Sequence, residues 1–222
     1  VHLRRQRQMC IRDSRHGLSS FNKERRIQGR DDLSNLSEEG HEQARALGRS
    51  LDDVSLQAIY SSPLQRAAAT TASLLETKGG QAPDPVFDDG LLEVDLEPWS
   101  GQTIDELMQG STEAYKIWKQ RPMELEPQRR DGSSYKPLPE LMEQAQDFIS
   151  KLLERHPANG NDTVLVVAHN AILRCLMLVL LGEPDHGFRR LRVDNTSLSV
   201  FNIRPGENLS LIHISEPTRR AL

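Results

Sequence analysis

Hydrophobic positions along the chain follow two periods, one typical of helices and one typical of strands. Ser37 is placed to cap a helix, because Glu38 and Glu39 follow it in the first turn. Leu47 and Leu51 then lie on the inner side of that helix. The same patterns predict the other elements: a strand over 56–60, a helix with Ser62 as N-cap and Pro63 at its first position that runs to residue 75, a turn-rich loop over 79–89, a helix that Thr103 opens, a helix over 139–155, a buried strand over 163–168, a helix over 170–181 and a final strand over 196–203. Strands that alternate with helices favour an α/β fold, a three-layer α/β/α sandwich with a mostly parallel central sheet.

One long segment fits neither period. Residues 119–139 are polar and contain four prolines. This composition predicts an irregular insertion or lid between two helices. We expect the insertion to set the specificity for any ligand, and its sequence contains no motif that identifies one.

The start of the chain combines a chemical motif with an unsuitable strand. Residues 9–17 read MCIRDSRHG. An Arg-His-Gly of this kind usually follows a buried apolar strand. The six residues before it instead carry Arg12 and Asp13. If they occupy the place of a central strand, Arg12 or Asp13 must be buried, which is costly for an unpaired charge.

Both ends of the chain can be back-translated into one inverted DNA repeat. Residues 4–14 admit a coding sequence that contains AGATGTGTATAAGAGACAG, and residues 209–219 admit its reverse complement, CTGTCTCTTATACACATCT. Such a repeat resembles a transposon-type library adapter. We therefore expect residues 1–14 to be an artefactual leader, residues 15–208 the native part and residues 209–222 an artefactual tail.

Composition and charge describe an ordinary globular protein. Its 222 residues, 36% hydrophobic and 27% charged, are enough for one large domain with a sizeable core. The net charge is −4, and it becomes −8 without the two ends, which carry +3 and +1. We therefore expect neither a nucleic-acid nor a membrane partner.

Several classes of protein are disfavoured by the remaining sequence features. The longest apolar run, 171–181, is interrupted by Arg174 and is too short to span a bilayer. The basic N-terminus lacks the apolar core of a signal peptide. Two cysteines, Cys10 and Cys175, provide neither a disulfide framework nor a metal-binding spacing. We expect a cytoplasmic protein.

Three polar patches follow predicted strands or open predicted helices. The carboxyl ends of strands in an open sheet line a common crevice, and helix N-termini there favour an anion. Between the last two patches, Glu93, Asp95 and Glu97 offer carboxyl groups. The patches read RHGLSSFN over 15–22, followed by QGR over 28–30; SSPLQRAAAT over 61–70; and VLVVAHN over 164–170.

In this order the motifs resemble those of the histidine phosphatase superfamily, with its phosphoglycerate mutase-like fold, over nearly all of residues 15–203. The resemblance implies that His16 is a nucleophile that forms a phosphohistidine. It implies that Arg15, Arg66 and His169 hold the phosphoryl oxygens. It also implies that Glu93, rather than one of the two neighbouring acids, donates a proton to the leaving group.

The chemistry of phosphoryl transfer agrees with these roles. Two guanidinium groups and a protonated imidazole can neutralise the equatorial oxygens, and a neutral imidazole is a nucleophile near pH 7. The sequence around the patches contains no carboxylate cluster with metal-binding spacing, so we expect neither a metal nor a cofactor. The expected substrate-binding residues are Asn22, Gln28, Gly29 and Asn170.

Departures from the mutase pattern favour a phosphatase. Mutases of this family typically carry RHGESxWN and a glycine after the second histidine, whereas this chain has Leu18, Phe21 and Asn170 at those places. The chain is more similar to bacterial α-ribazole phosphate and phosphoserine phosphatases. The preferred function is hydrolysis of a small phosphomonoester; a phosphoglycerate mutase and a non-catalytic phosphometabolite-binding module are the alternatives.

Three properties stay open at this point. The physiological substrate and the oligomeric state cannot be read from the motifs. The stretch HNAILRCL over 169–176 also resembles two-domain phosphatases of photosynthetic bacteria. It therefore leaves open whether the domain over 15–208 is one half of a tandem protein.

Overall fold

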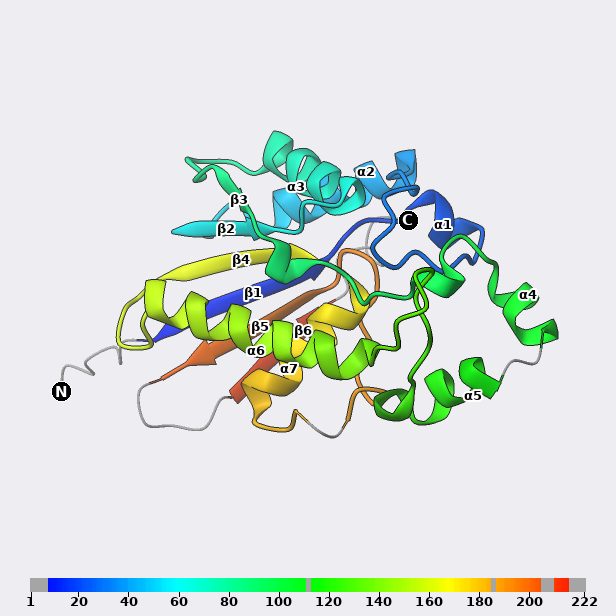
Figure 1. Cartoon of the computed structure of the whole chain (residues 1–222). Coiled ribbons are helices and arrows are strands. Elements are labelled where there is room, and N and C mark those ends of the chain that lie inside the picture. Colours follow the sequence, from blue (N-terminus) through cyan, green and yellow to red (C-terminus); the bar gives the residue numbers. More distant parts are fainter. Residues whose placement is uncertain (1–7, 111–112, 185–186, 205–209, 216–222) are drawn as a thin grey trace.

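A six-stranded sheet organises the chain in the computed structural model, which describes residues 8–110, 113–184 and 187–204 and the backbone of 210–215 (Figure 1). The strand order is β3-β2-β4-β1-β5-β6. β1 to β4 run parallel, whereas β5 is antiparallel to β1 and β6 is antiparallel to β5. The strands are β1 (Met9–Arg15), β2 (Ala58–Ser61), β3 (Pro85–Phe87), β4 (Thr163–Ala168), β5 (Leu198–Ile203) and β6 (Ser210–Ser215).

Helices cover both faces of this sheet, so the predicted three-layer α/β/α sandwich is confirmed (Figure 1). Leu165 and Val167 of β4 pack with residues of α2 and α3, and Val164 and Val166 point to the opposite core, built with α6 and α7. The helices are α1 (Ser20–Lys23), α2 (Glu38–Ser50), α3 (Gln65–Thr77), α4 (Ile104–Gln109), α5 (Glu113–Gln120), α6 (Pro137–Arg155) and α7 (Asn170–Leu181), with short 3-10 turns at Asp89–Leu91, Glu97–Trp99 and Pro122–Glu124.

Two helix starts agree with the predicted caps. The Ser37 hydroxyl accepts the Gly40 amide at 3.1 Å, and Leu47 inside the same helix is fully buried. Thr103 opens α4 with a reciprocal pair of hydrogen bonds to Glu106. These local interactions are satisfied within four residues, which is why the sequence predicts them.

The predicted start of α3 is wrong. The helix begins at Gln65 with Leu64 as N-cap, and no side chain caps it. Ser62 instead lies 2.8 Å from the Nε2 atom of His169. A contact between residues 107 positions apart has no trace in local sequence.

Two short strands were also not predicted. β3 lies inside the predicted loop over 79–89, and β6 follows the strand predicted to be the last. β6 lies within residues 209–222, which we expect to be an artefactual tail, and pairs with β5 through a register shift between Val200 and Phe201. Residues 119–139 contain the end of α5, one 3-10 turn and the start of α6, with irregular chain between them, as predicted.

β1 is the central strand despite its polar sequence. It pairs with β4 and β5 along its whole length. Met9 and Ile11 enter the core beneath α6 and α7. Asp13 points to the same face, is 2% exposed, and its Oδ1 atom has no hydrogen-bond partner in the described part of the chain. Burial raises the pKa of Asp13 to about 7, against a small lowering by Ser199.

None of the helices that the structure describes is long and apolar enough to cross a membrane.

Candidate active site

The carboxyl ends of β1, β2 and β4 meet at one edge of the sheet and bring the polar patches together. Arg15 ends β1 opposite Ala168 of β4. His16 follows, and its amide donates to the Ala168 carbonyl at 2.9 Å. His169, directly after β4, caps α7, and the centroids of its ring and the His16 ring are 5.2 Å apart. The crevice expected from the topology therefore places two imidazoles side by side.

His16 is held in one tautomer. Its Nδ1 atom lies 2.7 Å from the Gly17 carbonyl oxygen, which can only accept, so Nδ1 carries the proton and Nε2 keeps a free lone pair. Burial lowers the pKa of His16 well below its ordinary value of 6.5, and the Arg15 and Arg66 charges lower it further. A neutral imidazole with a free Nε2 is a suitable nucleophile.

Gly17 keeps this geometry because a side chain has no room there. A Cβ atom at this position would lie 2.5 Å from the Gly40 carbonyl oxygen of α2. The Gly17 amide also donates to the Thr70 hydroxyl at 2.9 Å. The glycine of the Arg-His-Gly motif is therefore explained by the close approach of α2.

Two arginines flank His16, and each has N–H donors that the described residues do not use. Arg15 donates to the Val193 carbonyl at 3.0 Å, and Arg66 donates to the Gly29 carbonyl at 2.9 Å. Nε of Arg15 and both Nε and Nη1 of Arg66 are buried and have no partner among the described residues. Burial lowers the pKa of Arg15 to about 10, so Arg15 stays charged near pH 7, and burial also lowers the pKa of Arg66.

His169 is buried beside His16 and is not among the residues that line the cavity. It is fully buried, and its Nε2 atom lies 2.8 Å from the Ser62 hydroxyl, whereas its Nδ1 atom has no partner in the described chain. Burial lowers the pKa of His169 well below 6.5, followed by the charges of Arg66, His16 and Arg15. The protonated imidazole expected from the sequence is thus disfavoured, first by burial and then by the neighbouring guanidinium groups.

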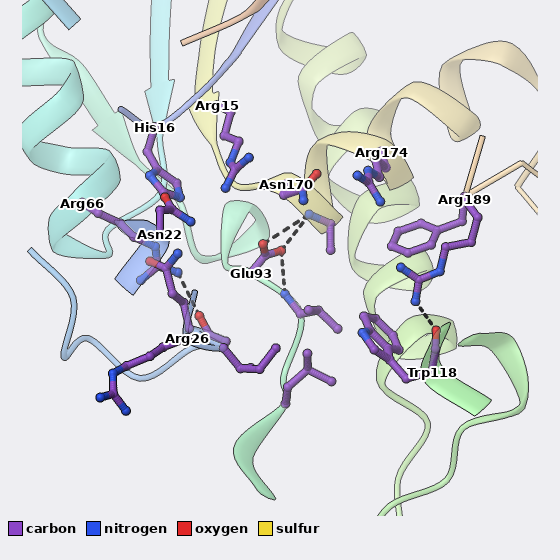
Figure 2. Close-up of a pocket in the computed structure, with 17 residues that line it drawn as sticks. Arg15, His16, Asn22, Arg26, Arg66, Glu93, Trp118, Asn170, Arg174 and Arg189 are labelled. Carbon is purple, nitrogen blue, oxygen red and sulfur yellow. Dashed lines mark hydrogen bonds between the residues drawn. The ribbon is translucent and has the colours of Figure 1, made fainter. Parts of the chain in front are cut away.

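Glu93 lies at the N-terminus of α7. Its carboxylate accepts hydrogen bonds from the amides of Ala171 and Ile172 at 3.1 to 3.2 Å, and from the Val94 amide at 2.9 Å (Figure 2). Asp95, the competing carboxyl group, forms an ion pair with Arg129 instead. Of the three predicted candidates, only Glu93 lines the cavity next to His16.

The predicted substrate-binding residues surround the same cavity, whose volume is about 190 Å³. The Asn22 carbonyl oxygen accepts from Ser19 and Asn195, which leaves its amide nitrogen free to donate. Gln28 accepts from the Ser19 hydroxyl at 3.0 Å. The lining residues are Arg15, His16, Asn22, Arg26, Ile27, Gln28, Gly29, Arg66, Glu93, Val94, Leu96, Trp118, Asn170, Ala171, Arg174, Phe188 and Arg189.

Gly29 and Asn170 take different positions around this cavity. The carbonyl group of Gly29, as described above, accepts from Arg66, so Gly29 helps to orient a cation. Asn170 is the first residue of α7, and its Oδ1 atom is buried with no described partner. His169 lies behind this layer, in ring contact with His16.

Several residues of the site were missed by the sequence analysis. Asn195 donates from Nδ2 to the His16 carbonyl at 2.8 Å and the Gly17 carbonyl at 3.1 Å. Ser62 and Thr70 lie in a quoted motif, but no role in the site was predicted for them; Ser62 was predicted only as a helix N-cap. Arg174 was noted only as an interruption of an apolar run. Its position four residues after Asn170 is the one signal that places it on the cavity side of α7.

The fold and the site together define an α/β protein with a compact, cationic, histidine-containing anion pocket at the carboxyl ends of its parallel strands. The model of the histidine phosphatase superfamily (branch 1) matches residues 14–213. The chain belongs to this superfamily, as the order of its motifs predicted.

Individual relatives carry several names. The chain is 32% identical over 197 residues to phosphoserine phosphatase 1 of Hydrogenobacter thermophilus, covering 89% of this chain and 88% of that protein. It is 33% identical to a probable phosphoglycerate mutase of Salmonella arizonae, covering 83% and 80%. Its structure is similar to that of the α-ribazole phosphatase of Shigella flexneri, with a TM-score of 0.79 and 25% identity over 94% of this chain and 97% of that one.

Proposed function

We propose that this protein is a phosphomonoester hydrolase that works through a phosphohistidine on His16, without a metal. The observation that carries the proposal is the set of buried, unpartnered nitrogens of Arg15, Arg66 and His169 around the free Nε2 atom of His16. Buried donors without partners are costly and rare. A phosphoryl group has enough acceptor oxygens to satisfy these donors.

The proposed reaction has two in-line steps. In the first, the His16 Nε2 lone pair attacks phosphorus, an N–P bond forms, the P–O bond to the substrate breaks, and Glu93 gives a proton to the leaving oxygen. In the second, Glu93 takes a proton from water, whose oxygen attacks phosphorus, and the N–P bond breaks. Inorganic phosphate leaves, and both side chains return to their starting states.

The protein's own cations supply the charge stabilisation in this proposal. Arg15 and Arg66 approach the equatorial oxygens from two sides, and a bound dianion offsets their effect on His169, which favours proton uptake by that imidazole. Within the described residues, no three His, Cys, Asp or Glu side chains are grouped so that they could hold a metal ion. The proposal also places the enzyme in the cytoplasm, on the ground that Cys175, the cysteine of the expected native part, is a free thiol.

A hydrolase is preferred to a mutase because of Leu18, Phe21 and Asn170, which replace residues typical of mutases. The names of two of the relatives, a phosphoserine phosphatase and an α-ribazole phosphatase, support the same choice. The cavity of about 190 Å³ is smaller than the roughly 300–1,000 Å³ of pockets for drug-sized ligands, in keeping with a small substrate.

A phosphatase assay on a panel of phosphomonoesters, with and without a metal chelator, tests the proposal. Phosphate release is expected from at least one member, unchanged by chelation, abolished in His16→Ala and retained in His41→Ala, whose imidazole contacts Ser73 outside the cavity. An alkaline quench followed by mass spectrometry should show phosphate on the peptide that contains His16. In Glu93→Gln, release of alcohols with a high pKa should slow by about 10²–10⁴-fold, and release of nitrophenol much less.

The alternatives give different results in the same assays. A mutase would interconvert phosphoglycerates when primed with a bisphosphoglycerate and release little phosphate. A binding module would bind phosphomonoesters without turnover. Phosphate release that survives in His16→Ala would overturn the proposed mechanism.

A further inference from the structure

The cavity holds far more positive charge than a phosphoryl group needs. Five arginines line it, and Glu93 is the only carboxyl group among its described lining residues. Arg15 and Arg66 flank His16. Of the other three, Arg26 lies below Asn22, and Arg174 and Arg189 lie on the opposite side of the cavity, beyond Glu93 (Figure 2).

Two of these three arginines already have strong partners. Arg26 forms an ion pair with Glu24 at 2.5 Å and donates to the Gly101 carbonyl at 2.7 Å. Arg189 donates to the Trp118 carbonyl, and its guanidinium carbon lies 4.8 Å from the centroid of the Trp118 ring. Both groups are therefore engaged by the protein.

Arg174 has no such partner. It forms no hydrogen bond and no ion pair with any residue that the structure describes, and its Nε atom is buried without a partner. Its guanidinium faces the Phe188 ring, with 5.5 Å between the guanidinium carbon and the ring centroid. The buried Nε donor of this guanidinium is therefore missing an acceptor.

The position of Arg174 indicates which part of the substrate could supply this acceptor. Arg174 lies one helical turn beyond Asn170 on α7, a rise of about 6 Å. In Figure 2 it lies on the side of Glu93 away from His16 and Arg66. If Glu93 protonates the leaving oxygen, the group that leaves lies next to Arg174.

We propose that the substrate's leaving group carries a carboxylate and that Arg174 binds it, which makes Arg174 a specificity-determining residue. The planar fork of one guanidinium matches one carboxylate with two parallel hydrogen bonds. A second phosphoryl group would call for more than one free cation, and Arg26 and Arg189 are not free. This inference rests on the proposed function and names the substrate class for the same site.

Matched substrate pairs test the inference. Phosphoserine and phosphoethanolamine differ only by a carboxylate, and 3-phosphoglycerate and glycerol 3-phosphate differ by a carboxylate in place of a hydroxymethyl group. The wild-type protein should have the higher kcat/KM for the carboxylate member of at least one pair. In Arg174→Met this preference should fall by about 10–100-fold, chiefly through KM, while kcat/KM for the other member stays nearly constant.

Two further variants complete the design. Arg190→Met removes the same charge from an exposed residue of the loop that follows α7 and should keep the preference. Arg174→Lys keeps the charge and most of the stem but loses the fork, so it should give an intermediate preference and also provides a folded variant if Arg174→Met unfolds. An equal loss for both members of each pair would overturn the inference, because Arg174 would then serve the phosphoryl group or Glu93.

Calorimetry of binding separates this inference from the proposed function. If no ester is hydrolysed, the proposed function fails, but tighter binding of 3-phosphoglycerate than of glycerol 3-phosphate, lost in Arg174→Met, would still support the carboxylate site. Equal binding of the two compounds by the wild-type protein would overturn the site even if hydrolysis is observed.

Discussion

Replacing Asp13 with valine should stabilise the protein, and by an amount that depends on pH. Asp13 lies in the middle of the central strand, 2% exposed, on the face that Met9 and Ile11 share. Its ordinary pKa is 3.8, and burial raises it to about 7 in the folded protein. Asp13→Val removes the buried carboxyl group and supplies a β-branched residue suited to a buried strand.

The sign and size of the effect follow from these two pKa values. Because the folded state binds the Asp13 proton more tightly than the unfolded state does, the stability that this proton contributes is fully present below pH 4. It is lost as the pH rises to about 7. A difference of roughly three pKa units lowers the free energy of unfolding by about 4 kcal/mol above pH 7. About 3 kcal/mol of this loss occurs between pH 5 and pH 8.

Urea unfolding, followed by circular dichroism at pH 5 and pH 8, measures this pH-dependent change in the free energy of unfolding. Asp13→Val should exceed the wild-type protein in free energy of unfolding at both values, and the gain should be about 3 kcal/mol larger at pH 8. Asp13→Asn should remove most of the pH dependence with a smaller gain, because it still buries a polar group. Asp53→Asn, at an exposed position, should change neither quantity. A gain of the same size at both pH values would refute the reasoning.

Four further substitutions probe the strand and the site. Replacing residues 9–14 with a Val- and Ile-rich strand should raise the free energy of unfolding beyond the gain of Asp13→Val, measured by the same urea titrations; no gain would contradict our account of β1. Gly17→Ala should destabilise by about 1–3 kcal/mol and reduce phosphate release, because the new methyl group meets the Gly40 carbonyl; wild-type activity and melting temperature would speak against it. Ser62→Ala should lower kcat/KM roughly tenfold with little change in melting temperature, since His169 loses its described partner; unchanged kinetics would show that this contact has no role. Asn195→Asp should be more harmful to stability and turnover than Asn195→Ala, because a carboxylate would face the carbonyl oxygens of His16 and Gly17; the reverse order would exclude the donor role.

What could be predicted from the sequence was local. The caps at Ser37 and Thr103 and the strand Thr163–Ala168 depend on residues within a few positions of each other, and each was predicted correctly. The motif residues around His16 were expected to meet because a parallel sheet brings its strand ends to one edge, and their roles were implied by the resemblance to the histidine phosphatase superfamily. Fold and family could therefore be predicted before any contact was known.

What could not be predicted depends on contacts between distant segments. Ser62 could cap α3 or contact His169, and only the arrangement of β2 and β4 decides between them. Asn195 reaches His16 from a loop nearly 180 positions later, and nothing in its surroundings marks it. The strand pairing of residues 9–14 conflicts with their polarity, so pattern alone argued against a strand that the sheet nevertheless contains.

Buried side-chain atoms without hydrogen-bond partners have two different meanings in this protein: some indicate a ligand-binding site, and others only reduce stability. Among the described residues they occur in two places: around the cavity, at Arg15, Arg66, His169, Asn170 and Arg174, and in the middle of β1, at Arg12 and Asp13. An anionic ligand can supply acceptors for the donors in the first group, so a phosphomonoester or inorganic phosphate should raise the melting temperature in proportion to its affinity. Arg12 and Asp13 do not line this cavity, and the part of β1 that carries them has β4 on one side and β5 on the other. The first group therefore points to a ligand, whereas the second lowers stability at neutral pH without serving the site.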